Sequence, residues 1–144
     1  MADHARKVNY YSTQVPDRPG AAFKVLATLV SSGVNLLACS GSQRDGLAWI
    51  DVVPDDDATF SDAVREAGFG FTSQKSGFLI QGDDRPGALA DNLRTFADAN
   101  INVAAIDAMV AGAGRWAAIL WVDAADVPRA ASVLGIAVPP DKGG

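Results

Sequence analysis

Two short turns hold the residues of this chain with the clearest chemical potential. The stretch VPDRPG at residues 15–20 returns as GDDRPG at residues 82–87. Each turn joins a strand-like segment to a helix-like one, and a helix begins with unpaired backbone N–H groups that favour a carboxylate. The carboxylates of Asp17 and Asp84 lie beside these N–H groups and can accept hydrogen bonds from an ammonium group. Each turn therefore predicts a site for a small zwitterion.

Glycine and asparagine residues extend each predicted site. Gly20 and Gly87 allow a ligand to approach the backbone closely. Asn35 and Asn102 open the next strand of each half, where an amide side chain that faces the turn offers both a donor and an acceptor. Each residue also has a purely structural explanation, as part of a good helix start or a turn. The duplication of the whole set favours binding.

The similarity between the two halves extends well beyond the turns. Residues 17–38 and 84–105 agree at nine of 22 positions at a constant offset. The spacing is then expected to stretch by two residues, which sets AWIDVV at 48–53 against AAILWV at 117–122. A duplicated unit of roughly 70 residues is the simplest explanation.

The same order of elements is predicted in each half. KVNYYSTQ and GFLIQ are short and rich in strand formers. A helix follows each turn, with Pro19 or Pro86 at its first position and an end near Gly33 or Asn100. The apolar face of these helices is expected to hold Ala22, Leu26, Leu29 and Val30 in the first half and Leu89, Leu93, Phe96 and Ala97 in the second.

The rest of each half is predicted to be a hairpin, a second helix and a closing strand. Asp45-Gly46 is a strong hairpin signal, whereas the second half has the looser AGAG. The second helices are expected in DDATFSDAVREAG and AADVPRAASVLG, and the closing strands in FGFTSQK and IAVPP. The fold class is therefore α+β, with two ferredoxin-like βαββαβ units that have antiparallel sheets and helices on one face. The predicted domains are residues 7–75 and 76–139.

Both alternating sets of residues are largely apolar in the strands LAWIDVV and WAAILWV. A two-layer unit buries only one face of its sheet under helices, so the second face needs its own cover. We expect the two repeats, or two chains, to pack on each other.

Composition excludes several classes of function. The chain has 17 acidic and 12 basic residues, a net charge of −5 and no basic stripe, which argues against nucleic acid. The longest apolar run, AAILWV, is too short to cross a bilayer, and the polar leader MADHAR is no signal peptide, so we expect a soluble cytoplasmic protein without a membrane partner. One cysteine, Cys39, expected as a small core residue, and one histidine, His4, expected in a disordered leader, cannot assemble a structural zinc site. No metal or cofactor is predicted.

The stretches DRPGAAFKVLATLVSSGVNLLAC at 17–39 and DRPGALADNLRTFADANINVAAI at 84–106 resemble the opening of ACT domains. These are regulatory modules of βαββαβ topology that commonly bind amino acids. The resemblance covers residues 7–138 and implies a tandem ACT protein without an attached catalytic domain. Aspartate stands in both turns where serine-sensing relatives often carry asparagine, so the resemblance leaves the amino acid open.

The resemblance also implies where the ligand sits, because ACT effectors bind at the first strand-to-helix turn and the start of the second strand, usually at an interface between two units. The implied ligand-binding residues are Asp17, Arg18, Gly20, Ala21, Asn35 and Leu36 in the first half and Asp84, Arg85, Gly87, Ala88, Asn102 and Val103 in the second. The expected function is regulatory binding of an amino acid or a similar small carboxylate. A homodimer and an enzyme regulated in trans are the expected partners.

Three other functions compete with this interpretation: an enzyme, an RNA-binding module and an interaction module without a ligand. An enzyme needs an acid, base or nucleophile, and none is placed with a recognisable partner; the run Asp55 to Asp57 is interpreted as a helix N-cap rather than a metal site. An RNA-binding module of the same topology needs exposed aromatic residues in a basic context, which Trp49, Trp116 and Trp121 lack. A module that binds no ligand and only mediates protein–protein interaction or dimerisation remains the principal alternative.

Overall fold

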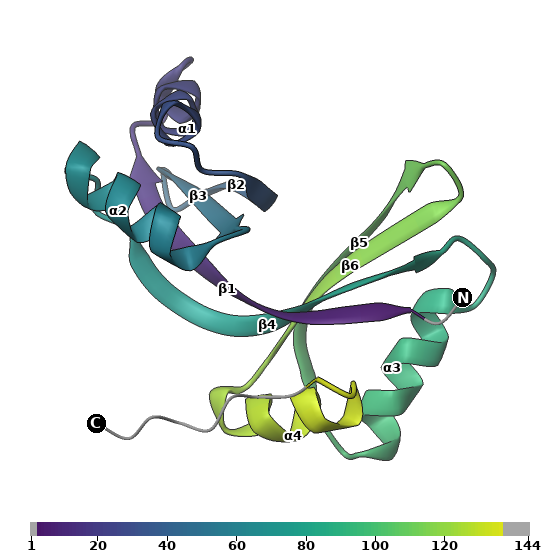
Figure 1. The fold of residues 1–144 in the computed structure, drawn as a ribbon. Coiled ribbons are helices and arrows are strands. Elements are labelled where there is room, and N and C mark those ends of the chain that lie inside the picture. Colours follow the sequence, from purple (N-terminus) through teal and green to yellow (C-terminus); the bar gives the residue numbers. More distant parts are fainter. Residues whose placement is uncertain (1–2, 137–144) are drawn as a thin grey trace. The chain divides into compact units, whose positions relative to one another are not determined.

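The computed structural model describes residues 3–136, which divide into two compact units. Among the described residues, the first unit is Asn9–Lys75, and the second unit comprises residues 3–8 together with 76–136. The strand order is β2-β3-β1-β4-β6-β5, in which β1 (His4–Val15) and β4 (Thr72–Asp83) each run from one unit into the other (Figure 1). The predicted α+β class with antiparallel sheets is confirmed.

The first unit places two helices against a sheet with the order β2-β3-β1-β4. Its further elements are α1 (Ala21–Ser31), β2 (Leu36–Arg44), β3 (Leu47–Pro54) and α2 (Asp57–Ala67). The helices meet one face of the sheet, because Leu29 and Phe60 from the helices share one buried cluster with Val52 of β3. Asp56 caps α2 by accepting a hydrogen bond from the Thr59 N–H at 3.0 Å, which confirms the predicted N-cap.

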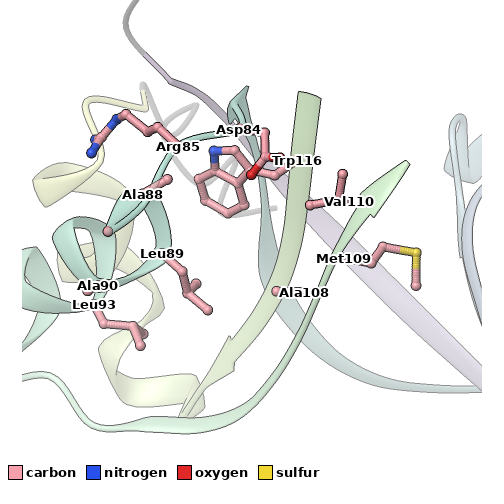
Figure 2. A pocket seen from close by; sticks show the side chains of 11 residues that line it. Asp84, Arg85, Ala88, Leu89, Ala90, Leu93, Ala108, Met109, Val110 and Trp116 are labelled. Atoms are coloured by element: carbon pink, nitrogen blue, oxygen red, sulfur yellow. The ribbon is translucent and has the colours of Figure 1, made fainter. Parts of the chain in front are cut away.

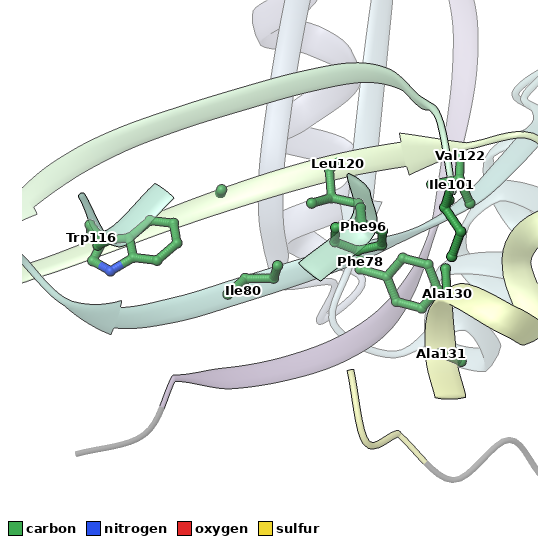
Figure 3. Packing of buried hydrophobic residues seen from close by; sticks show 11 residues of the cluster. Phe78, Ile80, Phe96, Ile101, Trp116, Leu120, Val122, Ala130 and Ala131 are labelled. Atoms are coloured by element: carbon green, nitrogen blue, oxygen red, sulfur yellow. The ribbon is translucent and has the colours of Figure 1, made fainter. Parts of the chain in front are cut away.

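The second unit repeats this arrangement with the order β1-β4-β6-β5. Its elements are α3 (Ala88–Asp98), β5 (Val103–Gly112), β6 (Arg115–Val122), the short 3₁₀ helix η1 (Ala124–Asp126) and α4 (Val127–Val133). Figure 3 shows Phe78 of β4, Phe96 of α3 and Leu120 of β6 packed together, and all three are buried in one cluster. The face of α4 that carries Ala130 and Ala131 closes this cluster.

The N-terminal segment is part of the second unit. β1 begins at His4, so the expectation of a disordered leader is wrong. Asn92 of α3 donates a hydrogen bond to the Asp3 carboxylate at 2.9 Å. A Cβ built on Gly82 of β4 would overlap that carboxylate. His4–Val8 therefore take the sheet position beside β4 that a fourth strand holds in this topology. The other candidate for that strand, IAVPP, lies outside the described residues from residue 137 onward.

Backbone conformations confirm the predicted hairpin turn and the predicted ends of the first helix in each half. Asp45 and Gly46 both have positive φ, of 54° and 74°, as a two-residue hairpin turn requires. Gly33 and Asn100 end α1 and α3 with φ of 81° and 57°. Ala113 and Gly114 also have positive φ and join β5 to β6 directly, so the looser AGAG stretch contains a tight turn as well.

Three details differ from the sequence predictions. The first helices begin at Ala21 and Ala88, each after a glycine with φ of 85°, so the prolines stand before the helix rather than at its first position. Val30 is 67% exposed, because the buried face of α1 is rotated by one residue and carries Ala21 and Leu29. Cys39 is exposed on the edge strand β2, so its assignment to the core is wrong.

The register of the sheets corrects the alignment of the third strands. Val15 pairs with Ala48 in the first unit, and Gly82 pairs with Trp116 in the second. Trp116 is therefore equivalent to Ala48, and the repeats stretch by one residue here rather than by the predicted two. The distinction matters because a slip of one residue moves every side chain of a strand to the other face.

Candidate functional site

The N-termini of α1 and α3 lack side-chain caps, in contrast to α2. Gly20 and Gly87 occupy the N-cap positions in a left-handed conformation, and within residues 3–136 neither helix start has a side-chain cap hydrogen bond. The first N–H of α3, from Ala88, donates to the Arg85 carbonyl at 3.2 Å, and the fourth, from Asp91, donates to the Gly87 carbonyl at 2.9 Å. The two N–H groups between them are the ones that a ligand can use.

A cavity of about 660 Å³ opens at the N-terminus of α3 (Figure 2). This volume falls in the range that small-molecule sites use. Its walls come from the turn before α3, from α3 itself and from the ends of β5 and β6 that meet at the hairpin. The lining residues are Asp84, Arg85, Gly87, Ala88, Leu89, Ala90, Leu93, Ala108, Met109, Val110 and Trp116. Four of the residues predicted for the second half thus lie together around one cavity.

The polar end of this cavity is the turn. The Asp84 N–H donates to the Gly114 carbonyl at 2.8 Å, which ties the turn to the β5–β6 hairpin. Arg85 reaches along α3 and pairs with Asp91 at 2.8 Å. Among the described residues, no side chain is bonded to the Asp84 carboxylate, which is exposed at the cavity. An ammonium group can therefore approach it without displacing a protein partner.

Apolar side chains form the remaining walls. Leu89 and Leu93 face the cavity from α3, while Ala108 and Val110 border it from β5. Met109 also lies at this edge, but its side chain points away from Leu89 and Leu93 in Figure 2. Met109 is 70% exposed and Val110 is 58% exposed, which is unusual for large apolar residues. These walls suit an apolar group rather than a charged one.

Trp116 lies at the base of the cavity and is only 5% exposed. Its indole nitrogen Nε1 is buried and has no hydrogen-bond partner among the described atoms. A Cβ built on Gly82 would lie 2.9 Å from this nitrogen, so the nitrogen lies against β4. A buried donor without a partner costs about 1–3 kcal/mol and is uncommon in folded proteins. Here it adds an unsatisfied polar atom beside the candidate site.

The corresponding turn of the first unit is arranged differently. Gln43, near the end of β2, donates its amide hydrogen to the Asp17 carboxylate. A cavity of about 310 Å³ lies beside α1, and Arg18 and Ala21 line it, but Asp17 and Gly20 do not. Its other walls include Val15, Val25 and the segment Gly68–Gly70. The residues predicted for the first site are therefore not gathered around one cavity.

Asn35 and Asn102 do not face the turn of their own unit. Leu36, the next residue after Asn35, pairs with Pro54 at one end of the first sheet, whereas Val15, just before the turn, pairs with Ala48 at the other end. Val103 likewise pairs with Val122, at the far end of β6 from Arg115. The reason is that the helix between turn and asparagine carries the chain back along the sheet. Asn35, Leu36, Asn102 and Val103 line neither cavity.

Asp83 precedes the turn of the second unit and forms an ion pair there. The Arg115 guanidinium donates to its carboxylate at 2.8 Å, and this hydrogen bond lowers the pKa of Asp83 below its usual value. The pair links β4 to β6 beside the hairpin. Two adjacent carboxylates thus have different surroundings, with Asp83 held by an arginine and Asp84 exposed at the cavity.

The sequence predictions did not include the cavity-lining residues outside the turn and the helix start, namely Leu89, Ala90, Leu93, Ala108, Met109, Val110 and Trp116. Leu89 and Leu93 were assigned to the apolar face of a helix, and Trp116 to packing. A signal for the β5 residues was present, because the equivalent stretch of the first repeat, Gly41-Ser42-Gln43, is not apolar. Only the strand register makes that comparison possible.

The described residues contain neither a metal-binding cluster nor a membrane-spanning helix. Within residues 3–136 no three His, Cys, Asp or Glu side chains converge as a metal site would need. No helix in the same range has the length and apolar character needed to cross a bilayer.

Comparison with known proteins identifies part of the chain. The family model described as ACT domain matches residues 78–136, so this part of the chain is an ACT domain. No curated protein sequence matches the chain.

Solved structures share the fold over nearly the whole length. A protein from Bacteroides thetaiotaomicron aligns with a TM-score of 0.76 and 15% identity over 91% of this chain and 88% of that chain. The regulatory subunit of aspartate kinase from Thermus thermophilus, in a ligand-free form, aligns with a TM-score of 0.62 and 16% identity over 94% and 95%. Aspartokinase III from E. coli, in complex with lysine and aspartate, gives 0.56 and 12% over 93% of this chain and 32% of that chain.

Proposed function

We propose that this chain is a regulatory protein, built from two ACT units, that binds an amino acid at the turn between β4 and α3. The single observation that carries the proposal is the cavity at the uncapped N-terminus of α3, where Asp84, Arg85, Gly87 and Ala88 meet. Its free helix N–H groups suit the carboxylate of an amino acid, and the Asp84 carboxylate suits the ammonium group. The ACT domain match and the fold shared with a regulatory subunit of aspartate kinase support a regulatory role rather than a catalytic one.

A second copy of the chain is proposed to complete the site. β5 is an edge strand, and its exposed Met109 and Val110 form an apolar stretch that a partner strand can cover. Antiparallel pairing of two β5 strands would set the start of one strand beside the end of the other. Asn102 of the second copy would then approach the turn that it cannot reach in its own unit. An enzyme regulated in trans is the proposed target of the dimer.

A thermal-shift screen of the twenty amino acids tests the proposal. A ligand at a hundred times its dissociation constant should stabilise the protein by about 2.7 kcal/mol. Substitution of Ala108, an exposed residue on the cavity wall, by tryptophan should fill the cavity and remove the shift. The matched control is Gly41→Trp at the equivalent position of the first unit, which should preserve it. If no amino acid raises the melting temperature, the chain is better described as an interaction module.

Sedimentation velocity tests the dimer separately. We expect a dimer that dissociates when Val110 on the β5 edge is replaced by lysine, because an exposed charge on an edge strand disfavours pairing. Ser42→Lys on the β2 edge of the first unit is the control and should leave the dimer intact. A monomer in the wild-type protein would remove the second copy from the proposed site.

A further inference from the structure

We infer that the chain has one working site, in the second unit, and that this site selects an amino acid with an apolar side chain. The inference rests on the proposed function and names its ligand class. It comes from comparing the two units position by position, which the register of the sheets allows.

The wall formed by β5 differs in character from its counterpart on β2. Met109 pairs with Ala117, and its equivalent Ser42 pairs with Trp49, the residue equivalent to Ala117. By the same register Ala108 is equivalent to Gly41, and Val110 is equivalent to Gln43. Ala108 and Val110 pair with the buried Ala118 and Trp116, so they lie on the sheet face that the helices cover, where the first unit has Gly41 and Gln43. Met109 pairs with Ala117 and lies on the opposite face. Only the second unit presents a continuous apolar wall opposite its helix.

The helix side of the cavity continues this wall. Leu89 and Leu93 contribute aliphatic groups from α3. Together with Ala108 and Val110 they leave no charged side chain along the part of the cavity that lies away from the turn. A charged ligand side chain would lose its hydration there without gaining a partner, which is unfavourable. An aliphatic side chain instead buries apolar surface on both partners.

In the first unit, a glutamine side chain already occupies the aspartate of the turn. Gln43 donates to the Asp17 carboxylate, the group that should receive the ammonium of a ligand. In the second unit the position of Gln43 is taken by Val110, which cannot donate, and the Asp84 carboxylate stays open at the cavity. The aspartate carboxylates of the two turns therefore differ in their hydrogen bonding. One Asp is already bonded within the protein, and the other is available.

Isothermal titration calorimetry of the full chain tests both parts of the inference. The probes are leucine, isoleucine, valine, methionine and phenylalanine, compared with serine, threonine, lysine and aspartate. We expect an apolar amino acid to bind at least about tenfold more tightly than any polar one, with one ligand per chain. Tighter binding of a polar amino acid would overturn the ligand class while leaving the proposed function intact. Absence of binding by all nine probes, together with no shift from any of the twenty amino acids in the thermal-shift screen, would overturn the proposed function itself, and the inference with it.

Reciprocal substitutions test why only one site works. Val110→Gln installs the amide of the first unit beside Asp84 and should weaken binding about tenfold or more, because the ligand must then displace a charged hydrogen bond. Val110→Ala is the matched control, since it shortens the wall without adding a donor, and should weaken binding by a smaller factor. Gln43→Val should leave the affinity of the second unit unchanged. Equal losses for Val110→Gln and Val110→Ala, or two ligands per chain in the wild type, would contradict the single open site.

Discussion

Gly82 and Trp116 are cross-strand partners on β4 and β6, and the missing side chain of the glycine leaves room for two groups at once. A Cβ built on Gly82 would lie 2.9 Å from the indole nitrogen of Trp116 and would overlap the Asp3 carboxylate. The equivalent pair in the first unit is Val15 and Ala48. The larger side chain of the pair is therefore on the first strand in the first unit and on the third strand in the second unit. This exchange lets the N-terminal segment dock beside the candidate site.

Gly82→Ala is expected to destabilise the second unit by about 1–3 kcal/mol, because the new methyl group overpacks the space that Asp3 and Trp116 share. Urea unfolding followed by tryptophan fluorescence measures the loss. Asp3→Ala should recover part of it, since it removes one of the two groups in conflict. Strictly additive effects in this double-mutant cycle would show that Gly82 and Asp3 do not interact.

Removal of residues 1–8 should weaken the second unit more than the first. These residues belong to the second unit, where Asp3 accepts a hydrogen bond from Asn92 and Val8 is 4% exposed. Without them β4 loses one of its neighbours and becomes an edge strand within that unit. Hydrogen exchange should show faster exchange in β4 from Ser76 onward and little change in β3. Equal loss of protection in both units would argue against this assignment.

Gly87→Ala should cost about 1–2 kcal/mol, because residue 87 has a positive φ of 85° that a Cβ disfavours. The space around it is open, with no atom within 4 Å of a built Cβ, so the backbone alone sets the cost. Gly20→Ala has the same φ of 85° and the same open surroundings, and should cost a similar amount. Chemical denaturation compares the two variants. Only the Gly87 variant is expected to lose ligand affinity in calorimetry, and equal losses would contradict a single working site.

The pair of Asp83 and Arg115 predicts a pH dependence at acid pH. The Arg115 hydrogen bond lowers the pKa of Asp83 in the folded protein. The stabilisation is therefore fully present above the unfolded-state pKa of about 3.9 and is lost as the pH falls through the lower, folded pKa. NMR titration of the Asp83 carboxyl group should show a pKa below 3.9 that rises toward that value in Arg115→Gln. An unchanged pKa in the variant would exclude Arg115 as the cause.

The elements of this fold were predictable because their signals are local. The Asp45-Gly46 turn, the Asp56 cap and the helix end at Gly33 each depend on residues that lie close together in the sequence. The predicted placement of Asn35 beside the turn failed for its own unit because the sheet register separates residues that the repeat pattern treats alike. Trp116 and Val110 could not be assigned to the cavity either, since their neighbours come from a helix and a strand distant in sequence.

The strand His4–Val8 has a consequence for how the protein is made. These residues are synthesised about seventy residues before the β4 segment beside which they settle. His4–Val8 must therefore remain without this neighbour while the residues of the first unit are synthesised. Completion of the second unit therefore requires segments that are made both before and after the first unit.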